Sequence, residues 1–310
     1  MSVRKVKAMG IGTFGYRLLA RIDPQILESF RDQVVECTFS APHLAAKFFP
    51  YQPLQRSYVV PPSGHPNPAA DLEPPVPPSN LWLGYAKTPQ QYLANGEKRT
   101  NQTREILKTT GFDLNPGARI LDFGCASGIM LRWFRDVAES GEAWGVDIAG
   151  TPIVWCQQNL SPPFKFATTT SFPYLPFEDR YFDLIYAGSV FTHIADLAEA
   201  WLLELKRITR PGGRLFITVS DNETIKCILD EHATPALYQP LRDFQEETHF
   251  QSSGFSMFSI NRTPGSGIAG QAQVFYDRDY LQRHWGNYLR VITTVPRVWG
   301  GKLTAVILER

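Results

Sequence analysis

The sequence has few cysteines and no long hydrophobic run. Its 310 residues include four cysteines, which are Cys37, Cys125, Cys156 and Cys227. None forms a C-x-x-C pair with another, which argues against a zinc site or a disulfide framework, so we expect no metal and a reducing cytoplasm. No segment approaches the roughly 18 uninterrupted apolar residues of a transmembrane helix. The apolar stretch over residues 8–20 is broken by glycines and Arg17, unlike a signal peptide.

The sequence also lacks an excess of either charge. It has 31 Lys and Arg residues against 30 Asp and Glu residues, a net charge of +1. Nucleic-acid-binding proteins usually have a basic excess, so we expect no nucleic-acid partner. The length allows one large α/β domain with additions, or two domains.

The first 80 residues differ from the rest. Prolines are dense between residues 50 and 78, which disfavours helix and central strand and predicts an extended connector. Upstream, residues 23–35 have the spacing of a short amphipathic helix capped by Asp23. We therefore expect residues 1–80 to form a helical and proline-rich extension.

From Leu81 onward, strand-like and helix-like segments alternate. Strands are expected at 118–124, 142–148, 164–170, 182–190 and 213–220, and helices at 95–111, 128–140, 151–160 and 196–209. This alternation predicts a parallel sheet with helices on both faces. Ser127 is expected to cap the helix over 128–140. Two final runs, 288–296 and 301–310, predict an antiparallel hairpin.

The segment 221–273 has an irregular pattern and is unusually long for a connection. It contains apolar and aromatic residues that do not suit a solvated linker. These are Tyr238, Phe244, His249, Phe250, Phe255, Met257 and Phe258. We expect it to form a substrate cap, and a flap that forms a homodimer is the alternative.

The run from Asp122 to Gly128 predicts a ligand-binding turn. It reads DFGCASG, whose glycines do not fit the G-x-G-x-x-G of dinucleotide sites. A carboxylate beside this loop suits a cationic ligand, and Asp147, after the next strand, suits a ribose. These features together favour an adenosine-like ligand without phosphates, such as S-adenosylmethionine (SAM).

Four blocks in order resemble class I SAM-dependent methyltransferases of the small-molecule or glycan type. They are ILDFGCASG, GVDI, SFPYLPFEDRYFDLIYAGSVFTHI and LKRITRPGGRLFITV. The resemblance covers residues 81–310. It implies a Rossmann-like, doubly wound, seven-stranded and mostly parallel sheet with a C-terminal antiparallel hairpin, following the N-terminal extension.

The resemblance also implies cofactor contacts. Gly124 and Gly128 would let the loop approach the methionine moiety, while Asp122 assists at the ammonium group. Asp147 would hold the ribose. Further contacts are implied for the backbones of Cys125, Ala126 and Phe172, for Ile148 and Ser171 at the adenine, for the Gly188 carbonyl, and for Tyr85 as a lid. Asp122 as a strand-end acceptor, Asp147 as a helix cap and Tyr85 as ordinary packing are the alternatives.

A base is needed if the methyl acceptor is a hydroxyl. His193 follows the fourth strand, and its ordinary pKa near 6.5 suits that role, although it could instead anchor its loop. His249 and His284 are weaker candidates, because no local pattern fixes their position.

We therefore expect SAM-dependent O-methylation of a small molecule or glycan hydroxyl. A nicotinamide-dependent oxidoreductase is disfavoured because the glycine at the third position of the fingerprint and a Tyr-x-x-x-Lys pair are missing. A non-enzymatic partner in a biosynthetic assembly is disfavoured by the intact acid and glycine set.

Overall fold

The computed structural model describes residues 35–38, 45–48, 74–170, 172–195, 197–231, 235–248, 255–261 and 272–310. Two short strands, β1 (Val35–Thr38) and β2 (Ala45–Phe48), pair antiparallel near the N-terminus. Nearly all of the helix expected over 23–35 and most of the proline-rich arm lie outside the described residues. Among those described, no helix is both long and apolar enough to cross a bilayer.

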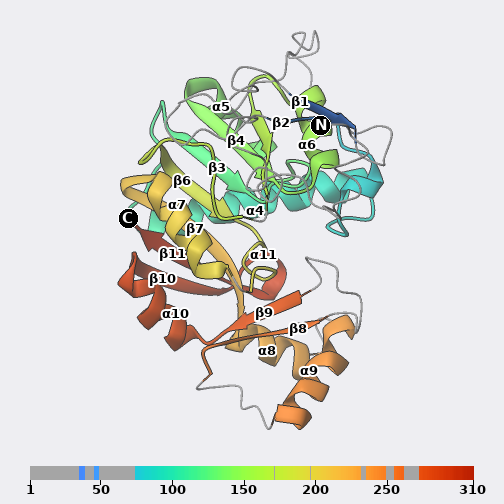
Figure 1. Ribbon diagram of the computed structural model, residues 1–310, viewed down its shortest axis with the longest axis vertical. Coiled ribbons are helices and arrows are strands. Elements are labelled where there is room, and N and C mark those ends of the chain that lie inside the picture. The colour runs from blue at the N-terminus through green and yellow to red at the C-terminus, as the bar shows by residue number, and fades with distance from the viewer. Residues whose placement is uncertain are drawn as a thin grey trace, which may run out of the picture.

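Seven strands of a nine-stranded sheet form the centre of the molecule (Figure 1), in the order β10-β11-β7-β6-β3-β4-β5. Its strands are β3 (Arg119–Phe123), β4 (Glu142–Asp147), β5 (Lys165–Thr168), β6 (Phe182–Ala187), β7 (Thr209–Asp221), β10 (Arg290–Arg297) and β11 (Leu303–Glu309). Strands β3 to β7 pair in parallel, and β11 runs antiparallel to both β7 and β10. The predicted sheet and hairpin are confirmed. The strand order reverses between β3 and β6, where open α/β sheets bind ligands.

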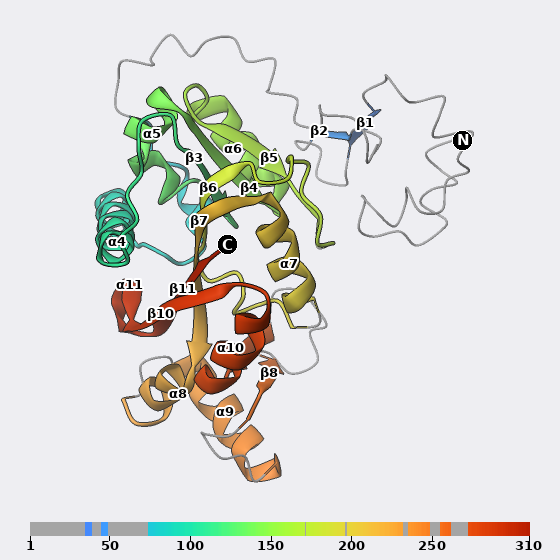
Figure 2. The same ribbon diagram turned by 90° about the vertical axis from the view of Figure 1, so that its left-hand side faces the viewer.

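Helices cover both faces of the sheet (Figure 2). One face packs against α4 (Pro89–Thr109), α5 (Arg135–Ser140) and α6 (Gly150–Asn159), and the other against α7 (Ala198–Ile208) and α10 (Arg278–His284). The alternation of side chains along a strand produces this division. Ile120 of β3 joins the first core and Leu121 joins the second, and both are fully buried.

The helix expected over residues 128–140 is wrong in its first half. The chain makes turns as far as Met130, then a short 3-10 helix, η2 (Leu131–Trp133), and only then α5. Gly128 has φ +74°, in the left-handed region, which interrupts a right-handed helix. The predicted cap at Ser127 is wrong, because no helix begins there, and its hydroxyl donates to the Leu81 carbonyl at 2.9 Å.

The segment expected to be irregular instead forms a small lobe. It contains α8 (Asn222–Leu229), α9 (Pro235–Thr248), β8 (Met257–Asn261) and β9 (Ala272–Tyr276). The end of β9 pairs in parallel with the last two residues of β7, so the lobe extends from the sheet. Its own core includes Ile225, Leu241 and Phe275.

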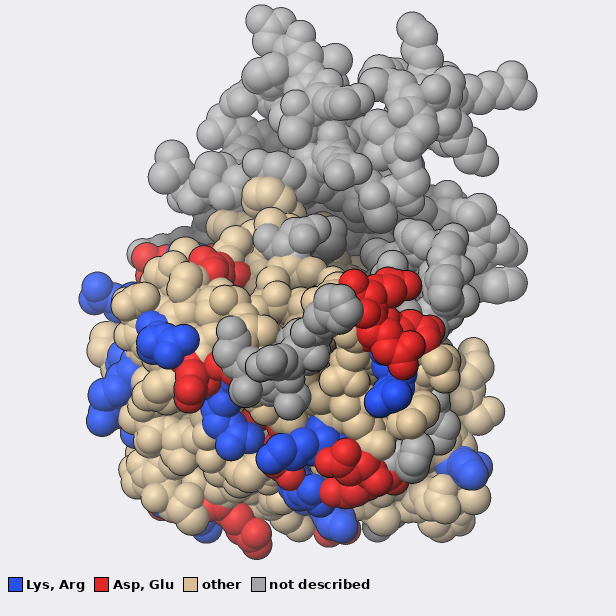
Figure 3. All heavy atoms as spheres, turned by 90° about the horizontal axis from the view of Figure 1, so that it is seen from below, with Lys and Arg blue, Asp and Glu red and all other residues tan. Residues whose placement is uncertain are grey.

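On the face of the molecule seen from below, acidic and basic side chains are interspersed (Figure 3).

Phe258 lies at the centre of the aromatic packing in the lobe. Its ring centroid is 4.6 Å from that of Phe244, 5.0 Å from Phe275 and 5.2 Å from Phe255. We predict that Phe258→Ala lowers the free energy of unfolding by about 2–4 kcal/mol, because a large ring leaves a packed cluster. Urea unfolding followed by circular dichroism measures the change. Leu203→Ala, at a position 43% exposed on α7, is the control and should change stability by under about 1 kcal/mol. Equal stability of the two variants would contradict the packing argument.

Candidate cofactor site

The loop after β3 is held against the end of β4 by backbone donors. The N–H groups of Gly124 and Cys125 both donate to the Val146 carbonyl, at 2.8 and 3.0 Å. The N–H of Ala126 donates to Asp147 Oδ2 at 2.8 Å. These bonds cross from one parallel strand to the next and fix the loop in place.

Both predicted glycines of this loop have a steric reason to be glycine. Gly124 has φ +84°, and a Cβ there would lie 2.2 Å from a methyl carbon of Val190. At Gly128, a Cβ would lie 2.9 Å from a methyl carbon of Leu160. Gly124 lines the pocket described next, whereas Gly128 faces the core behind it.

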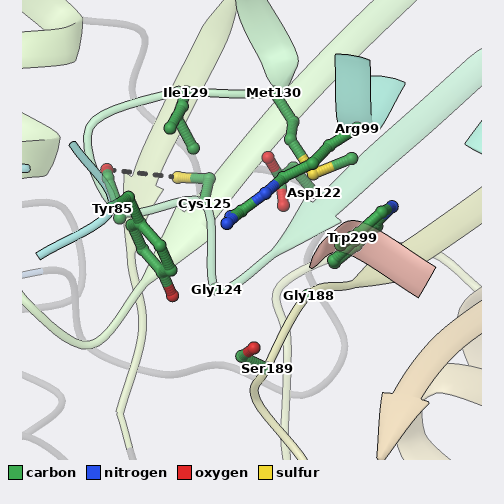
Figure 4. Close-up of a pocket in the computed structure, with 11 residues that line it drawn as sticks. Tyr85, Arg99, Asp122, Gly124, Cys125, Ile129, Met130, Gly188, Ser189 and Trp299 are labelled. Atoms are coloured by element: carbon green, nitrogen blue, oxygen red, sulfur yellow. Dashed lines mark hydrogen bonds between the residues drawn. The ribbon is translucent and has the colours of Figure 1, made fainter. Parts of the chain in front are cut away.

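A narrow pocket opens beside the loop (Figure 4). Six predicted site residues line it, namely Tyr85, Asp122, Gly124, Cys125, Ala126 and Gly188. Five lining residues were not predicted, namely Arg99, Ile129, Met130, Ser189 and Trp299. The structure therefore brings together residues from α4, the ends of β3 and β6, and the β10–β11 hairpin.

Asp122 is the buried acid of the pocket, with 4% of its surface exposed. Burial raises the pKa of its carboxyl group well above the usual range, and the nearby charge of Asp147 raises that pKa further. The hydroxyl of Tyr186 lies beside it and partly offsets this rise in the pKa. That hydroxyl is buried and makes no hydrogen bond of ordinary geometry within the described chain. A cationic group bound beside Asp122 would favour the ionised carboxylate and lower this pKa.

Asp147 is the last residue of β4, and its carboxylate accepts two hydrogen bonds from backbone N–H groups. Its Oδ2 accepts from Ala126, and its Oδ1 accepts from the N–H of Ala149 just before α6 at 2.8 Å. The helix-cap alternative is not seen, because Ala149 is itself the N-cap residue of α6 and that helix has no side-chain cap. Each oxygen of Asp147 can accept a further hydrogen bond, so these backbone bonds are compatible with ligand binding. Burial raises the pKa of Asp147.

The predicted adenine contacts lie at the same edge of the sheet. Ile148 is 62% exposed directly after β4, and Phe172, after β5, is 40% exposed. Neither lines the narrow pocket. The N–H of Phe172 donates to Thr170 Oγ1 at 3.2 Å. Ser171 lies outside the described residues, so its adenine contact stays a prediction.

Tyr85 and Arg99 close another side of the pocket (Figure 4). The Tyr85 carbonyl accepts from Asn95 Nδ2 at 2.8 Å, which ties the predicted lid to α4. The Arg99 guanidinium lies 4.8 Å from the centre of the Tyr85 ring. It forms no ion pair within the part of the chain that the structure describes. Burial lowers the pKa of Arg99.

His193 lies in the turn after β6 and outside the pocket lining. Its Nδ1 is 2.8 Å from the Ala272 carbonyl at the start of β9. A carbonyl oxygen only accepts, so Nδ1 is the donor and Nε2 is the basic nitrogen. Of the weaker candidates, His284 pairs with Glu199 on α7, and His249 lies outside the described residues.

Comparison with known proteins gives the family. The model of the methyltransferase domain family matches residues 96–262. An uncharacterized methyltransferase of Schizosaccharomyces pombe is 26% identical over 205 residues, which cover 60% of this chain and 68% of that protein. The ubiquinone/menaquinone biosynthesis C-methyltransferase UbiE of Chromobacterium violaceum is 29% identical over 117 residues, covering 36% of this chain and 46% of that protein.

Two solved methyltransferase structures match about 70% of this chain. A SAM-dependent methyltransferase from Aquifex aeolicus has a TM-score of 0.44 and 17% identity, covering 72% of this chain and 98% of that one. The glycopeptide N-methyltransferase MtfA complexed with SAM has a TM-score of 0.46 and 11% identity, covering 68% and 94%. The family match spans more than half of the chain. The chain therefore belongs to the methyltransferase domain family.

Proposed function

We propose that this enzyme methylates a hydroxyl oxygen of a small molecule or glycan, with SAM bound across the carboxyl ends of β3, β4 and β6. One observation carries the cofactor placement. The same pocket contains the buried Asp122 carboxyl and the Arg99 guanidinium, which has no ion-pair partner among the described residues. A carboxyl group that ionises beside a bound cation and a guanidinium in the same pocket are complementary to the ammonium and carboxylate of an amino acid, which SAM carries at its methionine end.

The loop after β3 supports SAM over a nicotinamide dinucleotide. A dinucleotide places its pyrophosphate at the N-terminus of the helix that follows the first strand. Here that strand leads into turns and η2, and α5 begins only at Arg135. The site also has a buried acid where a pyrophosphate would be repelled.

Each residue has a distinct task in this proposal. Bound SAM supplies an activated methyl group, so the chain mainly has to position its ligands and accept a proton. Asp122 and the Gly188 carbonyl face the ammonium, Arg99 binds the carboxylate, and Asp147 holds the ribose. His193 Nε2 takes the proton of the acceptor hydroxyl.

The lobe is the proposed acceptor cap. It leaves the sheet at the end of β7, and two bonds tie β9 to the turn after β6. His193 Nδ1 donates to the Ala272 carbonyl, and the Val274 N–H donates to the Thr192 carbonyl at 2.9 Å. The lobe and the proposed base therefore share a hydrogen-bonded contact. The match to UbiE, a C-methyltransferase, covers about a third of this chain, so we base the oxygen acceptor on His193 instead.

Arg99 provides a test of the cofactor's orientation. We predict that Arg99→Met weakens SAM binding about tenfold or more, because a charge-assisted hydrogen bond is lost. The same variant should bind decarboxylated SAM as the wild type does. Calorimetric titration measures both ligands. Lys98→Met removes the neighbouring charge, which is exposed on α4, and serves as the matched control. Equal weakening of both ligands would remove Arg99 from the carboxylate site.

Asp122 should make SAM binding depend on pH. The ordinary pKa of an aspartate carboxyl is about 4. Because burial raises the pKa of Asp122 in the folded protein, this carboxyl in the free enzyme stays protonated above pH 4, and it loses the proton as pH rises through the raised pKa. A bound ammonium favours the carboxylate, so affinity should rise with pH and binding should release protons. Calorimetry in two buffers of different ionisation enthalpy measures the release. Asp122→Asn should bind SAM more weakly with less proton release.

Asp122 has a linked effect on stability. Since the folded state holds the proton more tightly than the unfolded state, the free energy of unfolding falls as pH rises over that range. Asp122→Asn removes this fall, so its melting temperature relative to wild type should increase with pH. A constant difference between the two proteins would contradict the raised pKa.

His193 can be tested as base and as anchor separately. The side-chain amide of asparagine can donate in place of Nδ1, but it is not a base. If His193 is the base, His193→Asn lowers turnover by about 10²–10⁴ with little change in melting temperature or SAM affinity. Production of S-adenosylhomocysteine from a reactive acceptor reports turnover. Nearly full activity of His193→Asn, with loss of stability in His193→Ala, would show an anchor only.

A further inference from the structure

Trp299 comes from the C-terminal hairpin and lines the pocket beside Gly188 (Figure 4). It lies in α11 (Val298–Gly301), the tip that joins β10 to β11. Thr304 of β11 pairs with Val219 of β7, so this tip lies at the carboxyl edge of the sheet, where the parallel strands end. No motif of the sequence analysis includes this residue.

The conformation of Trp299 is unfavourable by itself. Its φ of 51° and ψ of 47° are left-handed, a region that disfavours side chains with a Cβ. Gly300 and Gly301 have positive φ values without that penalty. The indole Nε1 is also buried without a hydrogen bond to any residue that the structure describes. A tryptophan held this way is a typical feature of a functional site.

Three contacts fix the ring and the tip. The indole stacks on Phe216 of β7, with ring centroids 5.6 Å apart and planes 21° apart. The backbone N–H of Trp299 donates to Gln102 Oε1 of α4 at 3.1 Å. Arg297, at the base of the tip, forms ion pairs with Glu223 and Glu231. The ring is therefore in position before any ligand binds.

Gly188 makes room for the ring. A Cβ at this position would lie 2.7 Å from Cζ3 of the indole. The six-membered ring of Trp299 therefore packs against bare backbone at the end of β6. This places a flat apolar surface next to the residue that we assign to the methionine ammonium.

The strand order indicates which half of the site this surface serves. The proposed cofactor contacts come from β4, β3 and β6, whereas Trp299 comes from the hairpin beyond β7. An acceptor must reach the methyl group from a side that the cofactor does not occupy. The hairpin side of the pocket meets that requirement.

We propose that Trp299 is a specificity-determining wall of the acceptor subsite and selects acceptors with a planar, apolar ring, such as aromatic alcohols. The indole face stacks on a flat ring, and a puckered saturated ring of the same size makes poorer contact. This inference rests on the proposed function, because it requires SAM in the same pocket.

The test uses two probes with the same carbon skeleton and one hydroxyl group, the flat 1-naphthol and the puckered decahydro-1-naphthol. Each is titrated calorimetrically into the full chain saturated with S-adenosylhomocysteine. Wild type should bind 1-naphthol about three- to tenfold more tightly. Trp299→Phe, which retains a flat ring, should keep most of this preference. Trp299→Gly, which suits the left-handed backbone, should lose this preference when it is likewise saturated with S-adenosylhomocysteine.

Trp155→Ala is the control, since it removes a half-buried indole of α6 outside the pocket, and it should keep the preference. The proposal is overturned if wild type does not favour 1-naphthol, or if Trp299→Gly keeps the preference. Failure of wild type to bind S-adenosylhomocysteine would instead contradict the cofactor placement. Thermal melting confirms that each variant is folded. Trp299→Phe tests whether a smaller flat ring at this position is enough to keep the preference.

Discussion

The hydrogen bonds between the loop after β3 and the end of β4 are the constraint on which the site depends. Val146 accepts two of the loop's N–H groups and Asp147 accepts a third. These bonds hold the loop against the end of β4, so it does not continue as the first turn of a helix. The Asp147 carboxylate is oriented by the same bond, and by its bond to Ala149, before any ligand arrives. Such preorganisation reduces the ordering that binding would otherwise require.

The sheet was predictable because its strands are short apolar runs, and the local pattern reflects burial on both faces. The helix after β3 was not. Ile129, Met130 and Phe134 have helical spacing, yet all three are buried at 6% exposure or less within the core formed by α4, α5 and α6. Their spacing reflects packing around turns, and the sequence does not distinguish this from an amphipathic helix. The helices and strands of the lobe were not predicted for a related reason, since its aromatic residues pack on one another.

The site was predictable only where one short motif contains its residues. Asp122, Gly124 and Ala126 lie within five positions of each other, and the structure places all three at the pocket. Arg99 lies on α4 and Trp299 lies on the hairpin. They are far apart in the sequence, and the tertiary fold brings them to the same pocket. No local pattern reveals such a contact, although a tryptophan beside Gly300 and Gly301 is a weak signal.

Backbone strain links these separate segments. Ala126, Ser189 and Trp299 are non-glycine residues with φ of 48°, 58° and 51°, and each lines the same pocket from a different loop. A single left-handed residue can have a local cause, but three that converge on one cavity require surrounding contacts strong enough to hold them. Those contacts are present for each residue. Asp147 accepts the Ala126 N–H, Thr218 Oγ1 accepts the Ser189 N–H at 2.8 Å, and Phe216 stacks on the indole of Trp299. The pocket is thus shaped by the sheet behind it.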